Sequence, residues 1–126
     1  MQVRLFGSIL GAAWVAGMAG FAAAQDYPNK PIRLVVPFDA GGTVDTLGRV
    51  VTTQITKQSG VRFIIDNRPG ANSAIGSAAV ARATPDGYTV LNVSPSIVLN
   101  ALLRKDLPYA LHKGFVPLTN IGIGQG

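Results

Sequence analysis

Three short apolar runs recur along the chain at nearly equal distances, and this regular spacing constrains the fold more than any other feature. The runs lie at residues 32–36, 61–65 and 88–93, so that their starts are 29 and 27 residues apart. Each run is rich in β-branched or aromatic residues and is flanked by Gly or Pro, which is typical of β-strands. The stretches between them are long enough for helices, so the pattern predicts strand, helix, strand, helix, strand.

The first intervening stretch carries apolar residues at steps of three and four, the period of a helix that buries one face. We expect this helix to follow Gly41-Gly42, to be capped by Thr43 and to end at Gly60. Asp45 falls in its first turn, where the helix dipole favours an anion and where the side chain can satisfy backbone N–H groups. The apolar positions of this helix are Val44, Leu47, Val50, Val51 and Ile55.

The second intervening stretch predicts a helix over residues 74–83, with Asn72 or Ser73 as its cap. A weaker helical pattern covers residues 97–103, and Pro and Gly residues interrupt the chain after it. The positions of the second helix that we expect to face inward are Ile75, Ala78, Ala79 and Ala83.

This alternation predicts an α/β fold with a parallel sheet and right-handed crossovers. Ligands of such sheets bind outside the carboxyl ends of the strands, where the loops would be residues 37–43, 66–73 and 94–96. The first two loops lead into helix N-termini, whose free backbone N–H groups and dipole attract anions. The sequence therefore predicts an edge of the sheet that suits an anionic ligand.

The composition excludes several kinds of chemistry. The chain has no cysteine and one histidine, which excludes a disulfide, a thiolate zinc site, a cysteine nucleophile and a multi-histidine metal site. Gly41-Gly42 lacks the Gly-Lys-Ser/Thr of a P-loop, and no nucleophile elbow surrounds Ser94 or Ser96. We expect no catalytic residue, no metal and no cofactor. The net charge of +5 comes from scattered residues, so nucleic acid is not an expected partner.

Charged residues near the expected ligand edge leave alternatives open. Asp39 and Asp45 flank the glycine pair, but no third acidic residue lies nearby in sequence, which argues against an acid–base pair or a metal site. Arg68 could clamp a ligand carboxylate, or it could pair locally with Asp66. The local pair is the simpler interpretation.

The first 24 residues have the composition of a secretory signal peptide. Arg4 is the only charge before Asp26, residues 5–18 are apolar or small apart from one serine, and three alanines precede Gln25. We expect cleavage after Ala24, and no later stretch is apolar enough to span a membrane. The mature chain is therefore expected to be exported.

Several motifs occur in a fixed order from residue 27 to about residue 122. They are Tyr-Pro-Asn-Lys-Pro-Ile-Arg-Leu-Val-Val-Pro-Phe at 27–38, Ala-Gly-Gly at 40–42 followed by Asp45, Asp-Asn-Arg-Pro-Gly-Ala at 66–71, Ile-Gly at 75–76, Pro-Asp-Gly-Tyr-Thr at 85–89, Leu-Pro-Tyr at 107–109 and Phe-Val-Pro-Leu-Thr at 115–119. Together they resemble Bug-type receptors, the periplasmic solute-binding proteins of tripartite tricarboxylate transporters. The order of the motifs carries the resemblance, because no single motif is specific.

The resemblance implies the first lobe of a type II periplasmic-binding-protein fold, a three-layer α/β/α arrangement with a mainly parallel sheet. Residues 25–118 would form this lobe, and residues 119–126 would begin the crossover to a second lobe. Such receptors are not enzymes: two lobes close like a flytrap over a dicarboxylate, a tricarboxylate or a related organic acid. The implied setting is the periplasm, with a monomeric receptor and with the membrane permease subunits of the transporter as partners.

The resemblance also implies ligand contacts in all three loops. Asp39 stands where the family usually has proline and Thr43 where it has a further glycine, and a carboxylate at Asp39 would repel an anionic ligand if it pointed inward. The ligand-binding residues carried over are Phe38, Ala40, Gly41, Gly42, Asp45, Asn67, Gly70, Ser94 and Ser96.

Receptors of this family are about twice as long as this chain or longer. The resemblance therefore implies an N-terminal fragment that binds its ligand weakly or not at all. Two other interpretations stay open at this point. One is an exported α/β enzyme, which would need a nucleophile–base pair; the other is an interaction module without a ligand.

Overall fold

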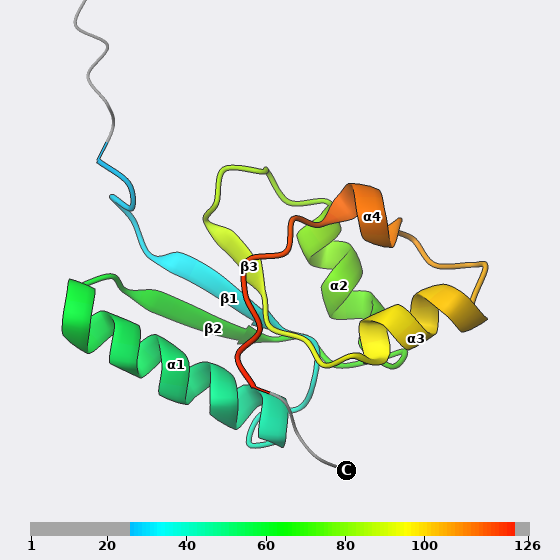
Figure 1. Ribbon diagram of the computed structural model, residues 1–126, viewed down its shortest axis with the longest axis horizontal. Coiled ribbons are helices and arrows are strands. Elements are labelled where there is room, and N and C mark those ends of the chain that lie inside the picture. Colours follow the sequence, from blue (N-terminus) through cyan, green and yellow to red (C-terminus); the bar gives the residue numbers. More distant parts are fainter. Residues whose placement is uncertain (1–25, 123–126) are drawn as a thin grey trace, which may run out of the picture.

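The computed structural model describes residues 26–122. The expected signal peptide, its cleavage site and residues 123–126 lie outside the described residues. Within residues 26–122 no helix is long and apolar enough to cross a membrane. The elements follow in the order β1 (Ile32–Val36), α1 (Thr43–Ser59), β2 (Phe63–Asn67), α2 (Ala74–Ala81), β3 (Thr89–Leu91), α3 (Ser96–Leu103) and α4 (Leu111–Gly114) (Figure 1).

The three strands form one parallel sheet in the order β2-β1-β3, as the alternation of strands and helices predicts. Leu34 at the centre of β1 is in register with Ile65 of β2 and Val90 of β3. β1 has the predicted bounds, and β3 is shorter than predicted. β2 begins and ends two residues later than predicted, and the carbonyl of Val61 ahead of it accepts a hydrogen bond from the Thr56 hydroxyl near the end of α1.

The sheet lies between α1 and α2 (Figure 1). α1 packs against β1 and β2, whereas α2 packs against β1 and β3. The sheet face turned away from α1 is only partly covered, since Ile64 of β2 is 57% exposed. The buried apolar residues gather around β1 and are Ile32, Leu34, Val35, Val36, Ala74, Ala78 and Ile97.

Helix α1 ends where the sequence predicts but begins differently. Gly60 adopts a left-handed conformation with φ 75°, and its N–H donates to the carbonyl of Thr56 at 2.9 Å. The predicted cap is wrong, because Thr43 is the first helical residue and Gly42 holds the cap position without a side-chain hydrogen bond.

The face of α1 that packs on the sheet also differs from the predicted one. A Cβ on Gly48 would lie 2.6 Å from Nδ2 of Asn92 and 3.2 Å from Cδ2 of Leu34, so the helix approaches the sheet too closely for large side chains. Asp45, Gly48 and Thr52 are buried, Val44 and Val51 are half-buried, and Leu47, Val50 and Ile55 are exposed.

Helix α2 also packs through small residues. A Cβ on Gly76 would lie 2.7 Å from Cβ of Pro37 at the end of β1. Ser73 holds the cap position as one of the two predicted residues, but its φ is 73° and its side chain makes no capping hydrogen bond. Of the predicted inward residues, Ala78 is buried, whereas Ile75 is exposed because Gly76 and its small neighbours take the packed face.

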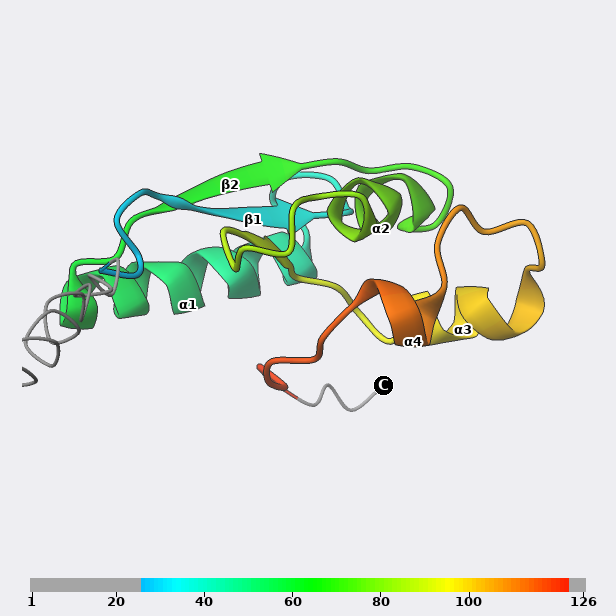
Figure 2. The same cartoon turned by 90° about the horizontal axis from the view of Figure 1, so that it is seen from above.

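The chain after β3 is less well covered. α3 confirms the helix predicted over 97–103, and α4 is a single further turn that the sequence analysis did not predict. Figure 2 shows α3 and α4 beside α2, with the following residues extending away from them. Many large apolar side chains of this part are exposed: Val98, Leu99, Leu102, Leu103, Val116, Leu118 and Ile121.

The residues ahead of β1 are fixed to the turn that precedes β3. The Tyr27 hydroxyl donates to the carbonyl of Gly87 at 2.7 Å, and the backbone N–H of Asn29 donates to the Tyr88 hydroxyl at 2.9 Å. The ammonium of Lys30 lies 4.3 Å from the centre of the Tyr88 ring. We call these five residues the N-terminal clasp. It lies at the amino ends of the strands.

Candidate ligand site at the carboxyl edge of the sheet

The carboxyl ends of the three strands meet at one edge of the sheet, because the strands are parallel neighbours. The loops that leave this edge are residues 37–42 after β1, residues 68–73 after β2 and residues 92–95 after β3. They correspond to the three loops expected from the sequence. This edge is the place where open α/β sheets bind ligands.

Asp45 ties the first of these loops to β2. Its Oδ2 accepts hydrogen bonds from the backbone N–H of Gly41 and from Nε of Arg49, both at 2.8 Å. Its Oδ1 accepts a hydrogen bond from Nδ2 of Asn67 at 2.9 Å, and the same amide reaches the carbonyl of Phe38 at 3.2 Å. Four of the predicted site residues therefore share one hydrogen-bond network with Arg49.

The electrostatics of this network favour an ionised Asp45. The hydrogen bond from Arg49 is the main cause that holds the pKa of Asp45 well below its usual value, the bonds from Gly41 and Asn67 add to it, and burial opposes them. The Asp45 side chain is only 1% exposed, so its carboxylate stabilises the loop and is not accessible to a ligand. The sequence analysis missed Arg49, although an Asp–Arg spacing of four on a helix indicates such a pair.

The first loop, held in this way, presents backbone N–H groups at its surface. Gly41 adopts φ 86°, a conformation that glycine favours, and the N–H of Gly42 makes only a long contact of 3.4 Å with the carbonyl of Asp39. The N–H groups of Thr43 and Val44 have no partner within the helix, and no acceptor binds them in the described part of the chain. We call the N–H groups of Gly42, Thr43 and Val44 the amide cradle. The side chain of Asp39 is exposed.

The second loop is held by internal contacts. Gly70 adopts φ 123°, and a Cβ there would lie 2.6 Å from Cδ1 of Ile75, so this position needs glycine for the turn itself. Arg68 donates to Oδ2 of Asp66 at 2.8 Å, so the structure contains the local pair rather than a free clamp. Burial acts to raise the pKa of Asp66, but the hydrogen bonds from Arg68 and Arg33 outweigh it and hold that pKa below its usual value.

The third loop carries the two predicted serines. Their hydroxyls lie 2.8 Å apart and are half-buried, and no hydrogen bond within residues 26–122 joins Ser94 or Ser96 to the first loop. Asn92 joins this loop to the first turn of α1 instead, because its Nδ2 donates to the carbonyl of Val44 at 2.8 Å. The sequence analysis missed Asn92, although a polar residue within an apolar strand pattern is a signal for such a role. The described residues contain no group of three or more His or acidic side chains that could hold a metal.

Comparison with known proteins decides the family. Residues 47–124 match the family model described as the tripartite tricarboxylate transporter family receptor, and this is more than half of the chain. The chain belongs to this family. A UPF0065 protein of Bordetella bronchiseptica is 45% identical over 101 residues, and BugT of Bordetella pertussis is 35% identical over 109 residues. The matches cover 79% and 85% of this chain but 30% and 33% of those proteins, so the chain spans about a third of their length.

Two solved structures extend the comparison to the fold. A periplasmic transporter is 44% identical with a TM-score of 0.61, over 66% of this chain and 28% of that one. A protein of R. palustris solved with adipate is 37% identical with a TM-score of 0.63, over 68% of this chain and 29% of that one. They confirm the expected resemblance and the α/β fold class. The family consists of periplasmic solute receptors and not of enzymes, which removes the interpretation as an exported enzyme.

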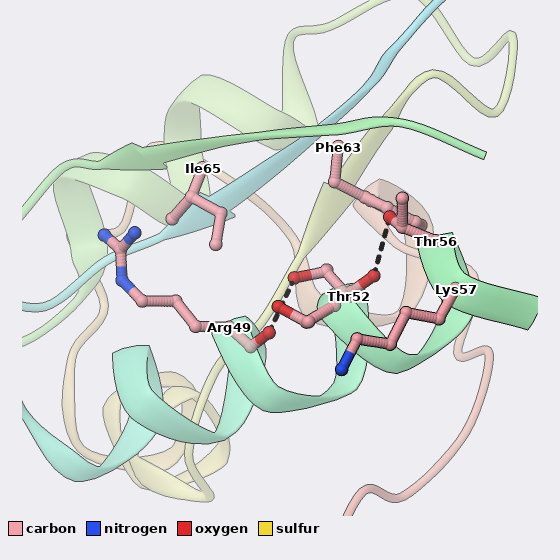
Figure 3. A pocket seen from close by; sticks show the side chains of 7 residues that line it. Arg49, Thr52, Thr56, Lys57, Phe63 and Ile65 are labelled. Atoms are coloured by element: carbon pink, nitrogen blue, oxygen red, sulfur yellow. Dashed lines mark hydrogen bonds between the residues drawn. The ribbon is translucent and has the colours of Figure 1, made fainter. Parts of the chain in front are cut away.

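A hollow of about 490 Å³ lies away from the carboxyl edge, between α1 and β2 (Figure 3). The sequence analysis did not predict it, and Arg49 is the one lining residue that also belongs to the Asp45 network. Figure 3 shows Arg49 and Lys57 at opposite ends, with threonine hydroxyls on the helix between them. The lining residues are Arg49, Thr52, Thr53, Thr56, Lys57, Phe63 and Ile65.

Proposed function

We propose that this chain is an extracytoplasmic receptor lobe for a small carboxylate, such as a dicarboxylate, a tricarboxylate or a related organic acid, and that it serves a tripartite tricarboxylate transporter. The amide cradle is the observation that carries the proposal. It combines the N-terminus of a 17-residue helix with a loop fixed by the buried Asp45. Free N–H groups at a helix N-terminus suit a carboxylate without a cationic side chain.

The roles of the predicted residues follow from their positions. The hydroxyls of Ser94 and Ser96 bind one another, and since only one of the two protons is used in that bond, the other can reach a ligand. Asp45 and Asn67 act as positioning residues, because their side chains bind each other and hold the first loop. Gly70 positions the second loop, because its conformation and the nearby Ile75 side chain require glycine. The backbone that approaches the ligand in this proposal is that of Phe38, Ala40, Gly41 and Gly42.

We infer that the described residues alone bind a carboxylate weakly, with a dissociation constant of roughly a millimolar or more. The loop residues beside the cradle are exposed, so that water competes for the N–H groups and screens the charge of the ligand. A ligand enclosed between two lobes is shielded from this competition, because water is excluded from the site. The weak affinity therefore follows from a site that a single lobe forms and that is open to water.

Export and docking complete the proposal. The composition of residues 1–24 supports export to the periplasm with cleavage after Ala24. The family description supports the permease subunits of the transporter as the membrane partner. Mass spectrometry of the protein recovered from the periplasm tests the first point, because an N-terminal peptide that starts at Gln25 is expected.

Amide chemical shifts test the carboxylate site at millimolar affinity. We expect titration of the ¹⁵N-labelled chain with adipate to move the resonances of the amide cradle and of Ser94 and Ser96, while those of the N-terminal clasp stay in place. Adipamide, which has the same carbon skeleton without charge, should leave all of them unmoved. Shifts confined to other residues would contradict the site, no shifts at all would favour a module without a ligand, and a micromolar affinity by calorimetry would contradict the weak binding.

A substitution in the cradle separates ligand contact from folding. Gly42 has φ −73° and ψ 171°, which other residues adopt, and the nearest atom to an added Cβ is the carbonyl oxygen of Asp39 at 3.4 Å. Gly42→Val should therefore keep the fold but fill the approach to the cradle and abolish the adipate-induced shifts. Gly122→Val is the matched control, since a Cβ there meets nothing within 4 Å. Equal shifts in both variants would contradict the role of the cradle.

A further inference from the structure

The second loop contains a turn with an unusual backbone conformation. Ala71, Asn72 and Ser73 have φ of 48°, 51° and 73°, although none of them is glycine. Residues with a Cβ enter the left-handed region rarely and then as single residues, asparagine more readily than most. Such a conformation persists only where the surrounding structure fixes it. The contacts of residues 71–73, which we call the left-handed turn, therefore identify what fixes this loop.

Asn100 in the middle of α3 supplies these contacts. Its Nδ2 donates to the backbone carbonyl of Asn72, and its Oδ1 accepts a hydrogen bond from Nδ2 of Asn72 at 2.9 Å. Asn72 is exposed, whereas Asn100 is only 4% exposed. A buried amide is costly unless it is hydrogen-bonded, so Asn100 depends on this partner. We call Asn72 and Asn100 the asparagine pair.

Helix α3 is attached to the lobe by few buried side chains. It lies beside α2 (Figure 1), and its buried residues are Ile97 and Asn100. Its other large apolar side chains are more than two-fifths exposed. No hydrogen bond within residues 26–122 joins residues 68–73 to residues 94–103 except the two of the asparagine pair. Loss of this pair should therefore loosen α3 as a whole.

The same helix carries one of the two serines of the proposed ligand site. Ser96 is the first residue of α3 and lies about one turn ahead of Asn100. Its hydroxyl is 2.8 Å from that of Ser94, so the two serines are placed together. Because a helical turn moves as a unit, the position of Asn100 determines where both hydroxyls lie at the carboxyl edge.

We propose that Asn100 is a positioning residue of the carboxylate site, which holds Ser94 and Ser96 in place by binding the left-handed turn of the second loop. Asn100 does not touch the ligand, because it is buried and its amide binds Asn72. A hydroxyl contributes to binding only when its position is fixed before the ligand arrives. The ligand part of this role rests on the proposed function, whereas the attachment of α3 does not.

Two glycine substitutions in the left-handed turn separate the amide from the backbone. Asn72 and Ala71 are both exposed and both left-handed, and glycine adopts this conformation freely. Asn72→Gly removes one hydrogen bond of the asparagine pair and leaves the buried Oδ1 of Asn100 without its donor, whereas Ala71→Gly removes neither.

Hydrogen exchange of the α3 amides measures the attachment without any ligand. We expect Asn72→Gly to accelerate this exchange at least about five-fold, because an unpaired buried acceptor is costly, and Ala71→Gly to change it by less than about two-fold. Exchange within α1 should stay the same in both variants. Equal exchange of α3 in the two variants would overturn the proposal.

Titration with adipate measures the effect on the site. Asn72→Gly should raise the dissociation constant at least about three-fold and reduce the shifts of Ser94 and Ser96, while Ala71→Gly should bind like the native chain. Equal affinities and equal serine shifts in both variants would overturn the role of Asn100 alone, even if α3 exchanges faster. No adipate-induced shifts in the native chain would overturn the proposed function and this role together.

A double substitution shows whether Asn72 acts through Asn100. In an Asn100→Ala background, Asn72→Gly should change the exchange of α3 by less than about two-fold further, because the pair is already broken. Multiplied effects of the two substitutions would overturn the proposal. Circular dichroism verifies that Asn100→Ala folds, and the comparison of Asn72→Gly with Ala71→Gly stands without it because both positions are exposed.

Discussion

Two aspartates near the start of α1 have opposite environments although only six positions separate them. Asp45 is buried and accepts hydrogen bonds from Gly41, Arg49 and Asn67. Asp39 is exposed beside the amide cradle. The first fixes the shape of the loop. The second belongs to no ion pair among residues 26–122 and places its negative charge near the proposed site of an anionic ligand.

Acid should destabilise the fold partly through Asp45. Its pKa is held below the usual value in the folded chain, so the ionised carboxylate contributes stability above the unfolded pKa of about 3.9, and this contribution is lost as the pH falls through that range and below it. We expect the melting temperature to fall between about pH 5 and about pH 2.5, and Asp45→Asn to flatten this dependence while lowering stability at neutral pH. Thermal unfolding followed by circular dichroism measures both effects. An unchanged slope would contradict the role of Asp45.

Removal of the charge at Asp39 should strengthen carboxylate binding. A like charge about 7 Å from the ligand in water-exposed surroundings disfavours binding by a factor of about two to three. Asp39→Asn should therefore lower the dissociation constant for adipate by that factor, measured from the chemical-shift titration in low salt. The gain should fade at high salt, because exposed charges are screened. A weaker affinity in the variant would indicate that Asp39 contacts the ligand directly.

At the scale of the elements, α1 shows that a tight approach can outweigh helix propensity. Alanine favours a helix over glycine by about 1 kcal/mol, but a Cβ on Gly48 would lie 2.6 Å from Nδ2 of Asn92. We expect Gly48→Ala to lower the free energy of unfolding by about 1–2 kcal/mol net, since overpacking costs more than the propensity contributes. Thr53→Ala, at an exposed position of the same helix, should instead raise it by up to about 0.7 kcal/mol, because alanine favours a helix over threonine. Urea unfolding measures both.

A double substitution isolates the cause of that loss. Asn92→Ala removes both the clashing atom and the hydrogen bond to Val44, and it should itself cost about 1–3 kcal/mol. In that background Gly48→Ala should cost clearly less than in the native chain, because the 2.6 Å contact is gone and only the 3.2 Å contact with Cδ2 of Leu34 opposes the gain in helix propensity. A coupling free energy below about 0.3 kcal/mol would show that the two positions act independently and would contradict the close contact.

The pattern of strands and helices was readable from the sequence, but the packed faces of the helices were not. The spacing of Val44, Leu47, Val51 and Ile55 correctly predicts a helix, because the period is a local property of the chain. Which side faces the sheet depends on how closely the helix approaches, and Gly48 allows an approach that only small or polar neighbours tolerate. The apolar residues of the helix are therefore exposed or half-buried instead of lying beneath it.

The candidate site was predictable to the same degree. The loops follow from the topology, since parallel strands bring their carboxyl ends to one edge. The hydrogen-bond partners that hold the loops lie far apart in sequence, such as Asp45 with Asn67 or Asn92 with Val44. A local pattern can mark one residue, such as Asn92, but it does not identify the partner. The cap expected at Thr43 was wrong because the helix begins one residue earlier than expected: Thr43 is already helical, and Gly42 at the cap position has no side chain that could accept a hydrogen bond.

At the scale of the whole molecule, helix α3 has an apolar outer side that the lobe leaves uncovered. Leu102 and Leu103 are 78% and 73% exposed, whereas Ile97 on the same helix is 8% exposed. We expect Leu102→Gln with Leu103→Gln to reduce binding of the dye ANS and to change the free energy of unfolding by less than about 0.5 kcal/mol per site. Ile97→Ala should lower it by about 2–4 kcal/mol. An equal loss of unfolding free energy in the double leucine variant and in Ile97→Ala would show that the leucines belong to the core.

The N-terminal clasp determines how the molecule can be attached to a surface or to a probe. Tyr27 and Asn29 hold the first described residues at the amino ends of the strands, while the amide cradle lies beyond their carboxyl ends. Five residues of β-strand separate the two poles by roughly 17 Å. A fluorophore or a sensor-chip linkage placed just ahead of Asp26 would therefore leave the cradle facing the solution, and the immobilised chain could be titrated with carboxylates without steric interference from its support.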